Sequence, residues 1–334
     1  MNISVRQKGI HRIALPTPFS IGSVNVYLVE GEALTLVDAG PKTVDAWESL
    51  KHQLRARGYS PSDIEQVVLT HHHVDHAGLL DFLREIGKVR VAGHPKNRPW
   101  IRQDETFYRE WHRFMEHLFR REGVEEPLIG PGIQKYQKFL QYNCRTDLDR
   151  EIAEGDEIPG MPGWKVKETK GHAQSHIALY REEDGLMIGG DHLIAHVSSN
   201  AMIEPPYPGE KVRAKPLIQY RKSLKECLGM ELSRVLAGHG KEITETRSLI
   251  EKRLIQQKKR AFALRDLLAG GGPMTCFELS KKLFPTKYNT QLPLVMSEIL
   301  GHLDLLESWG TVKREEKDGI YYYKLVDDGL RENR

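Results

Sequence analysis

The segment Thr70–His76 (Thr-His-His-His-Val-Asp-His) carries the residues of this chain whose types and spacing best suit chemistry. Imidazole nitrogens and a carboxylate together suit Zn, Fe or Mn as ligands. A histidine-rich surface loop is the alternative, but the flanking sequence favours a built site. The four candidate metal ligands lie within six positions: His71, His73, Asp75 and His76.

The flanking sequence places this segment between a strand and a helix. Asp63–Leu69 has the pattern of a strand leaving a turn, and Ala77–Leu83 has the pattern of a starting helix. A tight turn at the carboxyl end of a strand is where α/β proteins gather catalytic groups. The local context therefore predicts an active-site turn.

Three later positions repeat the same arrangement, with a candidate ligand in a glycine-containing turn beside a strand. His172 follows a glycine before a predicted strand, Asp191 follows the strand Gly185–Gly190, and His239 lies between two glycines. A Gly-His pair alone is weak evidence. In this order, after the first segment, the three positions together indicate a metal site with two ions.

These residues resemble the metallo-β-lactamase-fold superfamily over about residues 8–245. The His-x-His-x-Asp-His signature matches His71 to His76, and the later family positions match His172, Asp191 and His239. The full set is that of the glyoxalase II-type branch, whereas class B β-lactamases often carry Cys or Asn at some of these positions. The resemblance implies an α/β fold, the αββα sandwich.

The resemblance also implies how the ligands divide. One divalent ion would be held by His71, His73 and His172, the other by Asp75, His76 and His239, with Asp191 between them. Zinc is the expected metal, with Fe or Mn as alternatives, and a hydroxide bridging the two ions would be the nucleophile. Asp75 is the catalytic candidate, as the group that carries a proton toward the leaving group.

Histidine ligands usually donate their second N–H to a carboxylate or carbonyl, which fixes the tautomer. The resemblance gives that role to Asp38, which ends a predicted strand. His176 and His192 could each support a ligand, touch substrate or be structural. His72 is expected to point away from the metals.

The elements that must position these residues alternate short apolar strands with helices. Ser23–Val29 and Ala33–Val37 predict paired strands across the turn at Gly31. The other predicted elements of this part are a helix over Thr43–Gly58, strands at Lys88–Ala92, Trp164–Glu168, His176–Tyr180 and Arg234–Ala237, and a helix over Pro216–Leu228.

Residues 97–150 interrupt this rhythm with aromatic side chains at helical spacing, which predicts a helical insertion. Gly130–Gly132 predicts a break before a second helix that carries Tyr136 and Phe139. The insertion is the candidate lid and substrate-selecting surface. Alternatively, its aromatic stripe is only its own packing face.

Residues 246–334 predict a linker helix followed by a small α+β unit that resembles a winged helix. Helices are expected over Cys276–Leu283 and Leu292–Trp309, followed by a hairpin from Thr311 to Leu325. Similar units occur in relatives of a mitochondrial endoribonuclease, which raises RNA as a substrate. Packing against the catalytic domain or dimerisation is nevertheless the favoured role.

Charge is the reason for that preference. The segment 251–334 holds fifteen Lys+Arg against twelve Asp+Glu, and phosphate binding usually needs a more basic surface. The candidate recognition helix also carries acidic residues that would repel phosphate, namely Glu298, Asp304 and Glu307.

Composition sets the remaining bounds. The chain has 334 residues, with 49 Lys+Arg against 46 Asp+Glu, so two domains are expected, 1–245 and 246–334, without a global attraction to nucleic acid. It has no apolar run of membrane-spanning length and no signal-peptide pattern at the start. Three scattered cysteines, Cys144, Cys227 and Cys276, predict reduced thiols in a cytoplasmic protein.

These observations favour a dinuclear metal-dependent hydrolase that acts on a small ester, thioester or related acyl substrate. The alternative is a metal-dependent endoribonuclease that binds RNA through the winged helix. A non-enzymatic regulator that senses a ligand is third, because every catalytic ligand is present. Nucleic acid stays an open but disfavoured partner, no membrane partner is expected, and a homodimer stays open.

Overall fold

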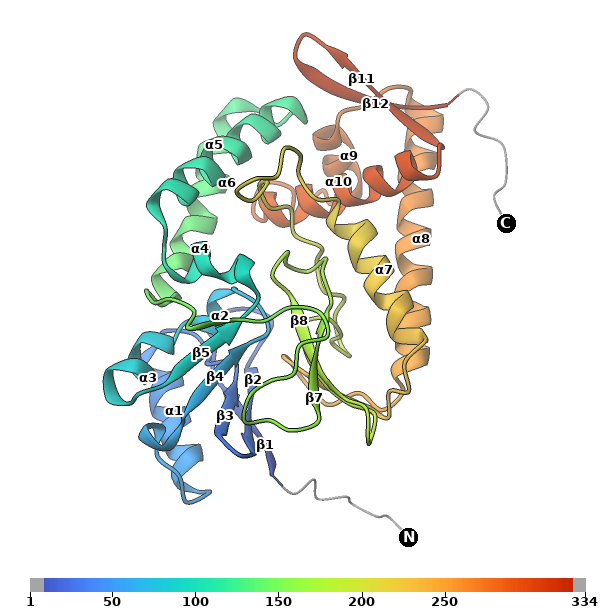
Figure 1. Cartoon of the computed structure of the whole chain (residues 1–334). Coiled ribbons are helices and arrows are strands. Elements are labelled where there is room, and N and C mark those ends of the chain that lie inside the picture. Colours follow the sequence, from blue (N-terminus) through green and yellow to red (C-terminus); the bar gives the residue numbers. More distant parts are fainter. Residues whose placement is uncertain (1–8, 327–334) are drawn as a thin grey trace.

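Two β-sheets pack face to face and helices cover their outer faces in the computed structural model, which describes residues 9–326 (Figure 1). The first sheet is antiparallel from β1 to β3 and parallel from β3 to β6. Its strands, in spatial order, are β1 (Ile10–Leu15), β2 (Val24–Glu30), β3 (Leu34–Val37), β4 (Gln66–Leu69), β5 (Arg90–Gly93) and β6 (Arg150–Glu151).

The second sheet has the order β10-β9-β8-β7. Its β9 and β10 are parallel, and its other neighbours are antiparallel. The strands are β7 (Trp164–Glu168), β8 (Ile177–Arg181), β9 (Leu186–Gly190) and β10 (Arg234–Ala237).

Alternating side chains divide the apolar residues among three layers of core. In β8, Ile177 and Leu179 face the first sheet, whereas Ala178 faces the helices. In β4, Val68 lies between the sheets, whereas Val67 packs under α1 (Val44–Arg55) and α3 (Leu80–Ile86). On the far side, α7 (Pro216–Leu228) covers the second sheet. The α/β fold and its αββα layers are thus confirmed.

Most elements occupy the residues that the sequence predicted. The helix Pro216–Leu228 and the strand Arg234–Ala237 have the predicted bounds. The predicted pair of strands after residue 22 is present as β2 and β3, in antiparallel register. A short helix, α2 (Val74–Ala77), begins inside the histidine-rich segment, one turn earlier than expected.

The insertion consists of helices, but the expected break in it is wrong. Helix α6 (Glu126–Gln137) continues through Gly130–Gly132, with Pro131 inside it. Tertiary packing overrides the local preference here, because a Cβ on Gly132 would lie 2.7 Å from the side chain of Leu292. The other helices of the insertion are α4 (Arg98–Ile101), α5 (Glu105–Arg121) and the 3₁₀ segment η3 (Lys138–Tyr142); two further 3₁₀ turns, η1 (Pro61–Asp63) and η2 (Pro95–Asn97), lie before it.

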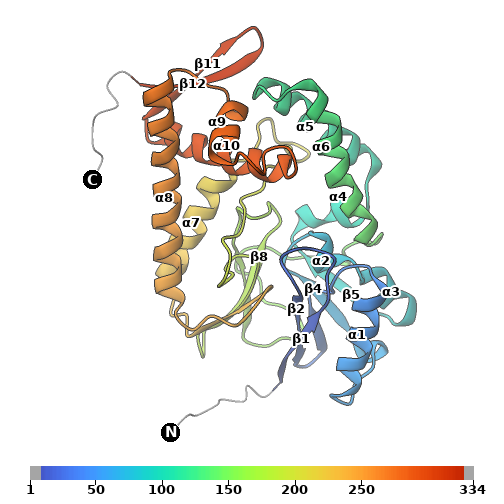
Figure 2. The ribbon, with the colours of Figure 1, turned by 180° about the vertical axis from the view of Figure 1, so that it is seen from behind.

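The carboxy-terminal unit packs into the rest of the molecule. Figure 2 shows α8 beside α7, and α10 between α8 and the insertion helices. One continuous apolar core joins this unit, the insertion and the outer face of the second sheet. The elements of the unit are α8 (Thr246–Gly271), α9 (Cys276–Leu283), α10 (Leu292–Ser308), β11 (Val312–Lys317) and β12 (Ile320–Leu325).

Cys144, Cys227 and Cys276 are buried free thiols. Within residues 9–326, no helix combines the length and the apolar character needed to cross a bilayer.

Candidate metal centre

The candidate ligands meet where strands of both sheets end at one edge. Asp38 follows β3 and Thr70 follows the parallel strand β4, whose Val68 pairs with Val37. In the second sheet, Asp191 follows β9 and His239 lies two residues after the parallel strand β10. Parallel strands place their carboxyl ends together, so sheet topology gathers these side chains.

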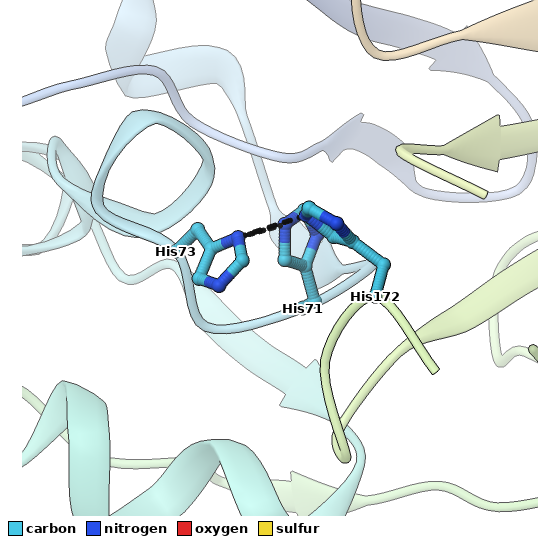
Figure 3. A group of neighbouring side chains, drawn as sticks. All are labelled: His71, His73 and His172. Atoms are coloured by element: carbon cyan, nitrogen blue, oxygen red, sulfur yellow. Dashed lines mark hydrogen bonds between the residues drawn. The ribbon is translucent and has the colours of Figure 1, made fainter. Parts of the chain in front are cut away.

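The turn after β4 and the segment before β8 supply the first group of imidazoles (Figure 3). The Nδ1 atom of His73 lies 3.0 Å from Nε2 of His71 and 3.0 Å from Nε2 of His172. His73 directly precedes α2, and its ring faces those of His71 and His172.

All seven predicted ligands fall into three overlapping groups, in each of which the ligand atoms lie within 4.8 Å of one another. One group is the trio that contains His172, and a second is the trio that contains His239 and Asp75. The third joins Asp191 to one member of each trio, His71 and His76. This overlap is the geometry expected if Asp191 lies between two ions.

The carboxylate of Asp191 faces imidazoles of both trios. Its Oδ2 lies 3.6 Å from Nε2 of His172 and 3.6 Å from Nε2 of His239, and its Oδ1 lies 3.4 Å from Nε2 of His76. Asp75 also contacts His239, with its Oδ2 at 3.3 Å from the Nε2 atom. Room for a cation remains between these atoms.

Hydrogen bonds on the second ring nitrogen orient the imidazoles. Nδ1 of His172 donates to the carbonyl of Asn200 at 2.8 Å, and Nδ1 of His239 donates to the carbonyl of Ser23 at 2.9 Å. Nδ1 of His76 donates to Asp38 at 2.8 Å. Each bond fixes the tautomer that leaves Nε2 as a lone-pair donor toward the centre.

Asp38 also fixes the turn that holds the ligands. Its carboxylate accepts the backbone N–H and the hydroxyl of Thr70, both at 2.8 Å. Nδ1 of His71 lies 3.0 Å from that hydroxyl oxygen. Asp38 has a φ of 63°, a left-handed conformation that costs free energy and is found at functional sites.

The three other histidines that the sequence analysis singled out take different places. Nε2 of His176 accepts the backbone N–H of Asp191 at 3.1 Å, so this side chain positions the central carboxylate. His192 lies against Tyr220 and Cys227, away from the ligand groups. His72 belongs to none of the ligand groups; its ring is stacked on Trp100 at 4.3 Å and bonded to Ser175.

Electrostatics divides the imidazoles into two sets. Burial and the neighbouring His172 lower the pKa of His73 to about 3, and burial holds the pKa of His71 well below its usual value. Burial also opposes the charged form of His76 and His239, but Asp191 and the other nearby carboxylates raise both pKa values. The carboxylates therefore favour positive charge beside them, which protons or metal ions can supply.

The donor set fits divalent cations. Nε2 of His76, Oδ1 of Asp191 and Nε2 of His239 are buried and have no hydrogen-bond partner within residues 9–326. Unpaired buried polar atoms are costly, and a cation bound by all three would remove that cost. Gly238 keeps the room for this arrangement, because a Cβ there would lie 2.3 Å from Oδ1 of Asp191.

A cavity of about 300 Å³ opens directly on the ligand groups. The histidines and carboxylates that line it are His72, His73, Asp75, His172, Asp191 and His239. Among the described residues, no Lys or Arg lines it; apolar and neutral polar side chains form the walls. It can therefore hold an uncharged organic group next to the candidate metals.

Several supporting residues could not be recognised from the sequence. The Nε1–H of Trp100 donates to the Tyr207 hydroxyl at 2.7 Å, and that hydroxyl donates to Glu204 at 2.5 Å. Burial raises the pKa of Glu204 to about 7. Among the supporting side chains that were missed, Thr70 lies directly beside the motif, and this adjacency was a local signal for it. The carbonyls of Ser23 and Asn200 act through the backbone, which residue types do not reveal.

Comparison with known proteins agrees with this geometry. Residues 20–239 match the family model described as the metallo-beta-lactamase superfamily. A Bacillus subtilis protein named "Probable metallo-hydrolase YqjP" is 43% identical over 314 residues, which are 94% of this chain and 97% of that protein.

Two solved structures are similar to this chain over nearly its whole length. The metallo-beta-lactamase family protein TTHA1429 from Thermus thermophilus has a TM-score of 0.78 and 29% identity, over 95% of this chain and 99% of its own. A beta-lactamase domain protein from Burkholderia ambifaria also has a TM-score of 0.78, with 25% identity over 95% of this chain and 92% of its own.

Proposed function

The chain belongs to the metallo-beta-lactamase superfamily and is a metallo-hydrolase, and from this premise we propose that it hydrolyses a small ester or thioester at a dinuclear centre. The observation that carries the proposal is the cavity that opens on the two ligand trios and has no Lys or Arg in its described lining. In the reaction, water adds to the acyl carbon, the bond from that carbon to oxygen or sulfur breaks, and an acid and an alcohol or thiol result.

The ligand assignment in this proposal follows the two trios. His71, His73 and His172 would hold one ion, Asp75, His76 and His239 the other, and Asp191 would contact both. Divalent cations there, zinc first and Fe or Mn as alternatives, would polarise the substrate carbonyl and activate water at neutral pH.

The chain's own residues supply orientation and proton transfer. Asp38 and the Asn200 and Ser23 carbonyls hold three imidazoles in one tautomer. Asp75 lines the cavity, so we assign it the transfer of a proton to the leaving oxygen or sulfur. The buried apolar side chains of the lining, among them Trp100 and Ile194, limit the access of bulk water and strengthen these electrostatic contacts.

Two observations favour an acyl substrate over RNA. A phosphodiester site normally carries Lys or Arg, and the described lining of this cavity has none. The candidate recognition helix α10 is buried along most of its length, and its Asp304 is paired with Arg213 at 2.7 and 2.8 Å. A recognition helix must instead present an exposed face to the nucleic acid.

The endoribonuclease, a homodimer and the cytoplasmic location stay predictions. The endoribonuclease is tested by the RNA arm of the experiment below, and the homodimer by a measurement of mass in solution.

The test compares zinc- and manganese-loaded protein on a panel of uncharged esters and thioesters and on a single-stranded RNA. Asp75→Ala is expected to lower ester or thioester turnover by about 10²-fold or more. Asp45→Ala, at an exposed position in α1, is the matched control and keeps full activity.

Thioester or ester hydrolysis that depends on Asp75, with RNA left intact, would support the proposal. RNA cleavage that is lost in Asp75→Ala, without ester hydrolysis, would replace the proposal with the nuclease.

A further inference from the structure

We infer that the cavity at the metal centre binds an apolar acyl chain and that Leu294, from the carboxy-terminal unit, forms part of the wall that selects it. This inference rests on the proposed function and names its substrate class: uncharged esters or thioesters of medium-length aliphatic acids.

Segments far apart in the sequence supply the apolar walls. Phe19 comes from the loop between β1 and β2, Tyr136 and Phe139 come from the insertion, and Ile194 follows β9. Leu294, in the first turn of α10, completes the lining. These apolar side chains stabilise methylene groups, and the other wall residues that the cavity presents, such as Asn143 and Ser199, are neutral.

The rim of the cavity carries several exposed apolar side chains. Phe139 is 39% exposed, Val197 is 37% exposed and Leu294 is 36% exposed, and all three line the cavity. They are three of the seven large apolar side chains exposed within residues 9–326. Clustered exposed apolar side chains mark binding sites, so the rim indicates where an acyl chain enters.

The wall around Leu294 is held in place by packing against the insertion. Leu292 lies against Gly132 of α6, where a Cβ would come within 2.7 Å of the Leu292 side chain. Nζ of Lys135 in α6 donates to the carbonyl of Thr290 at 2.6 Å. These contacts anchor the segment just before Leu294 and hold the start of α10 opposite Tyr136 and Phe139.

The wall gives the carboxy-terminal unit a role in catalysis that does not involve nucleic acid. The unit contributes Leu294 to the rim of the cavity, beside residues of the insertion. The acyl carbon would lie at the ligand groups and its chain would extend along the apolar wall. The leaving alcohol or thiol would face Asp75.

The experiment uses the full chain loaded with zinc and N-acetylcysteamine thioesters from acetyl to octanoyl. For the unaltered protein, kcat/KM is expected to rise by up to about fourfold for each buried methylene. Leu294→Glu is expected to lower kcat/KM for octanoyl about tenfold more than for acetyl, because a carboxylate then borders the chain. Leu294→Gln tests the same contact without adding charge.

Ile255→Glu is the matched control. Ile255 lies on α8 of the same unit, is 55% exposed, and is not part of the cavity lining. This variant is expected to keep the chain-length dependence of the unaltered protein. An equal loss in both glutamate variants would overturn the inference.

Binding provides a second readout that does not need turnover. Calorimetry with non-hydrolysable alkyl thioethers should show affinity that rises with chain length, together with a negative heat-capacity change. Turnover without chain-length dependence would overturn the inference and leave the hydrolase proposal intact. Chain-length-dependent binding that Leu294→Glu weakens, without any ester turnover, would support the cavity assignment and refute the proposed reaction. If neither binding nor turnover depends on chain length, the inference fails.

Discussion

At the scale of single residues, the candidate metal centre depends on hydrogen bonds to the nitrogen that each imidazole turns away from it. His76, His172 and His239 all use Nδ1 for this purpose, and their acceptors come from three different segments. Asp38 accepts through its side chain, whereas the other two acceptors are backbone carbonyls, so the contribution of Asp38 can be tested by substitution.

Asp38→Asn should weaken metal binding at the position that includes His76 by about 10- to 100-fold. An amide offers a weaker acceptor to Nδ1 of His76 and cannot accept both Thr70 donors equally well. Competition with a zinc chelator, followed equivalent by equivalent, measures the effect. Asp45→Asn is the control at an exposed site, and unchanged zinc affinity in Asp38→Asn would contradict the positioning role.

The raised pKa values of His76 and His239 predict pH-dependent metal binding. In the metal-free protein the carboxylates favour protonated rings, and a metal ion must displace those protons. Because both pKa values lie above 6.5, zinc affinity should increase with pH from about 6 to about 8. Calorimetry in two buffers of different protonation enthalpy measures the proton release, and zinc binding without proton release would refute the prediction.

At the scale of elements, the end of α5 is joined to the carboxy-terminal hairpin by a buried carboxyl. Tyr323 in β12 donates to the Glu122 oxygens at 3.0 and 3.1 Å, and the carbonyl of Glu122 accepts the N–H of Phe277. Burial raises the pKa of Glu122 to about 7. This contact fastens the insertion to the unit that carries Leu294.

A folded-state pKa raised from 4.5 to about 7 makes the contribution of Glu122 to stability complete below pH 4.5 and lost as the pH rises through 7. Glu122→Gln retains an acceptor for Tyr323 but does not titrate. The free energy of unfolding of this variant, relative to the unaltered chain, should therefore be about 1–3 kcal/mol larger near pH 8 than near pH 5.

Urea denaturation at the two pH values measures this difference. Glu183→Gln, at an exposed position, is the control and should track the unaltered chain. Parallel pH profiles for Glu122→Gln and the unaltered chain would show that burial does not perturb Glu122.

At the scale of the whole molecule, the carboxy-terminal unit contributes to the shared apolar core as well as to the cavity lining. Buried residues of α10 share one core with α7 and the insertion, and Ser297 accepts the N–H of Ile203. Arg213 depends on Asp304 for its two close hydrogen bonds. Removing the unit would expose this core and leave the Arg213 guanidinium without its carboxylate.

Truncation after Glu245 should therefore abolish cooperative folding, because the lost contacts exceed a typical net stability of about 5–15 kcal/mol. Thermal melting followed by circular dichroism, together with zinc content, tests this expectation. A truncated chain that melts cooperatively and binds zinc like the full chain would show that residues 1–245 fold alone.

Local patterns in the sequence determined the succession of short strands and helices, because alternating apolar side chains and turn residues act over a few positions, whereas the αββα layers were implied by the family resemblance. They also brought forward the ligand candidates, since His71 to His76 are consecutive and His172, Asp191 and His239 lie at strand ends. The path of α6 through Gly130–Gly132 was missed, because its contact with Leu292 joins residues about 160 positions apart.

Only the tertiary structure decided which groups each side chain contacts. The sequence could not tell whether His176 or His192 supports the centre; the fold sets His176 against Asp191 and His192 against Tyr220. Nor could it bring Leu294 to the cavity, because that contact depends on how α10 packs against α6. Residue types and spacing determine which chemistry is available, whereas distances between remote segments, which local patterns do not encode, decide which groups take part.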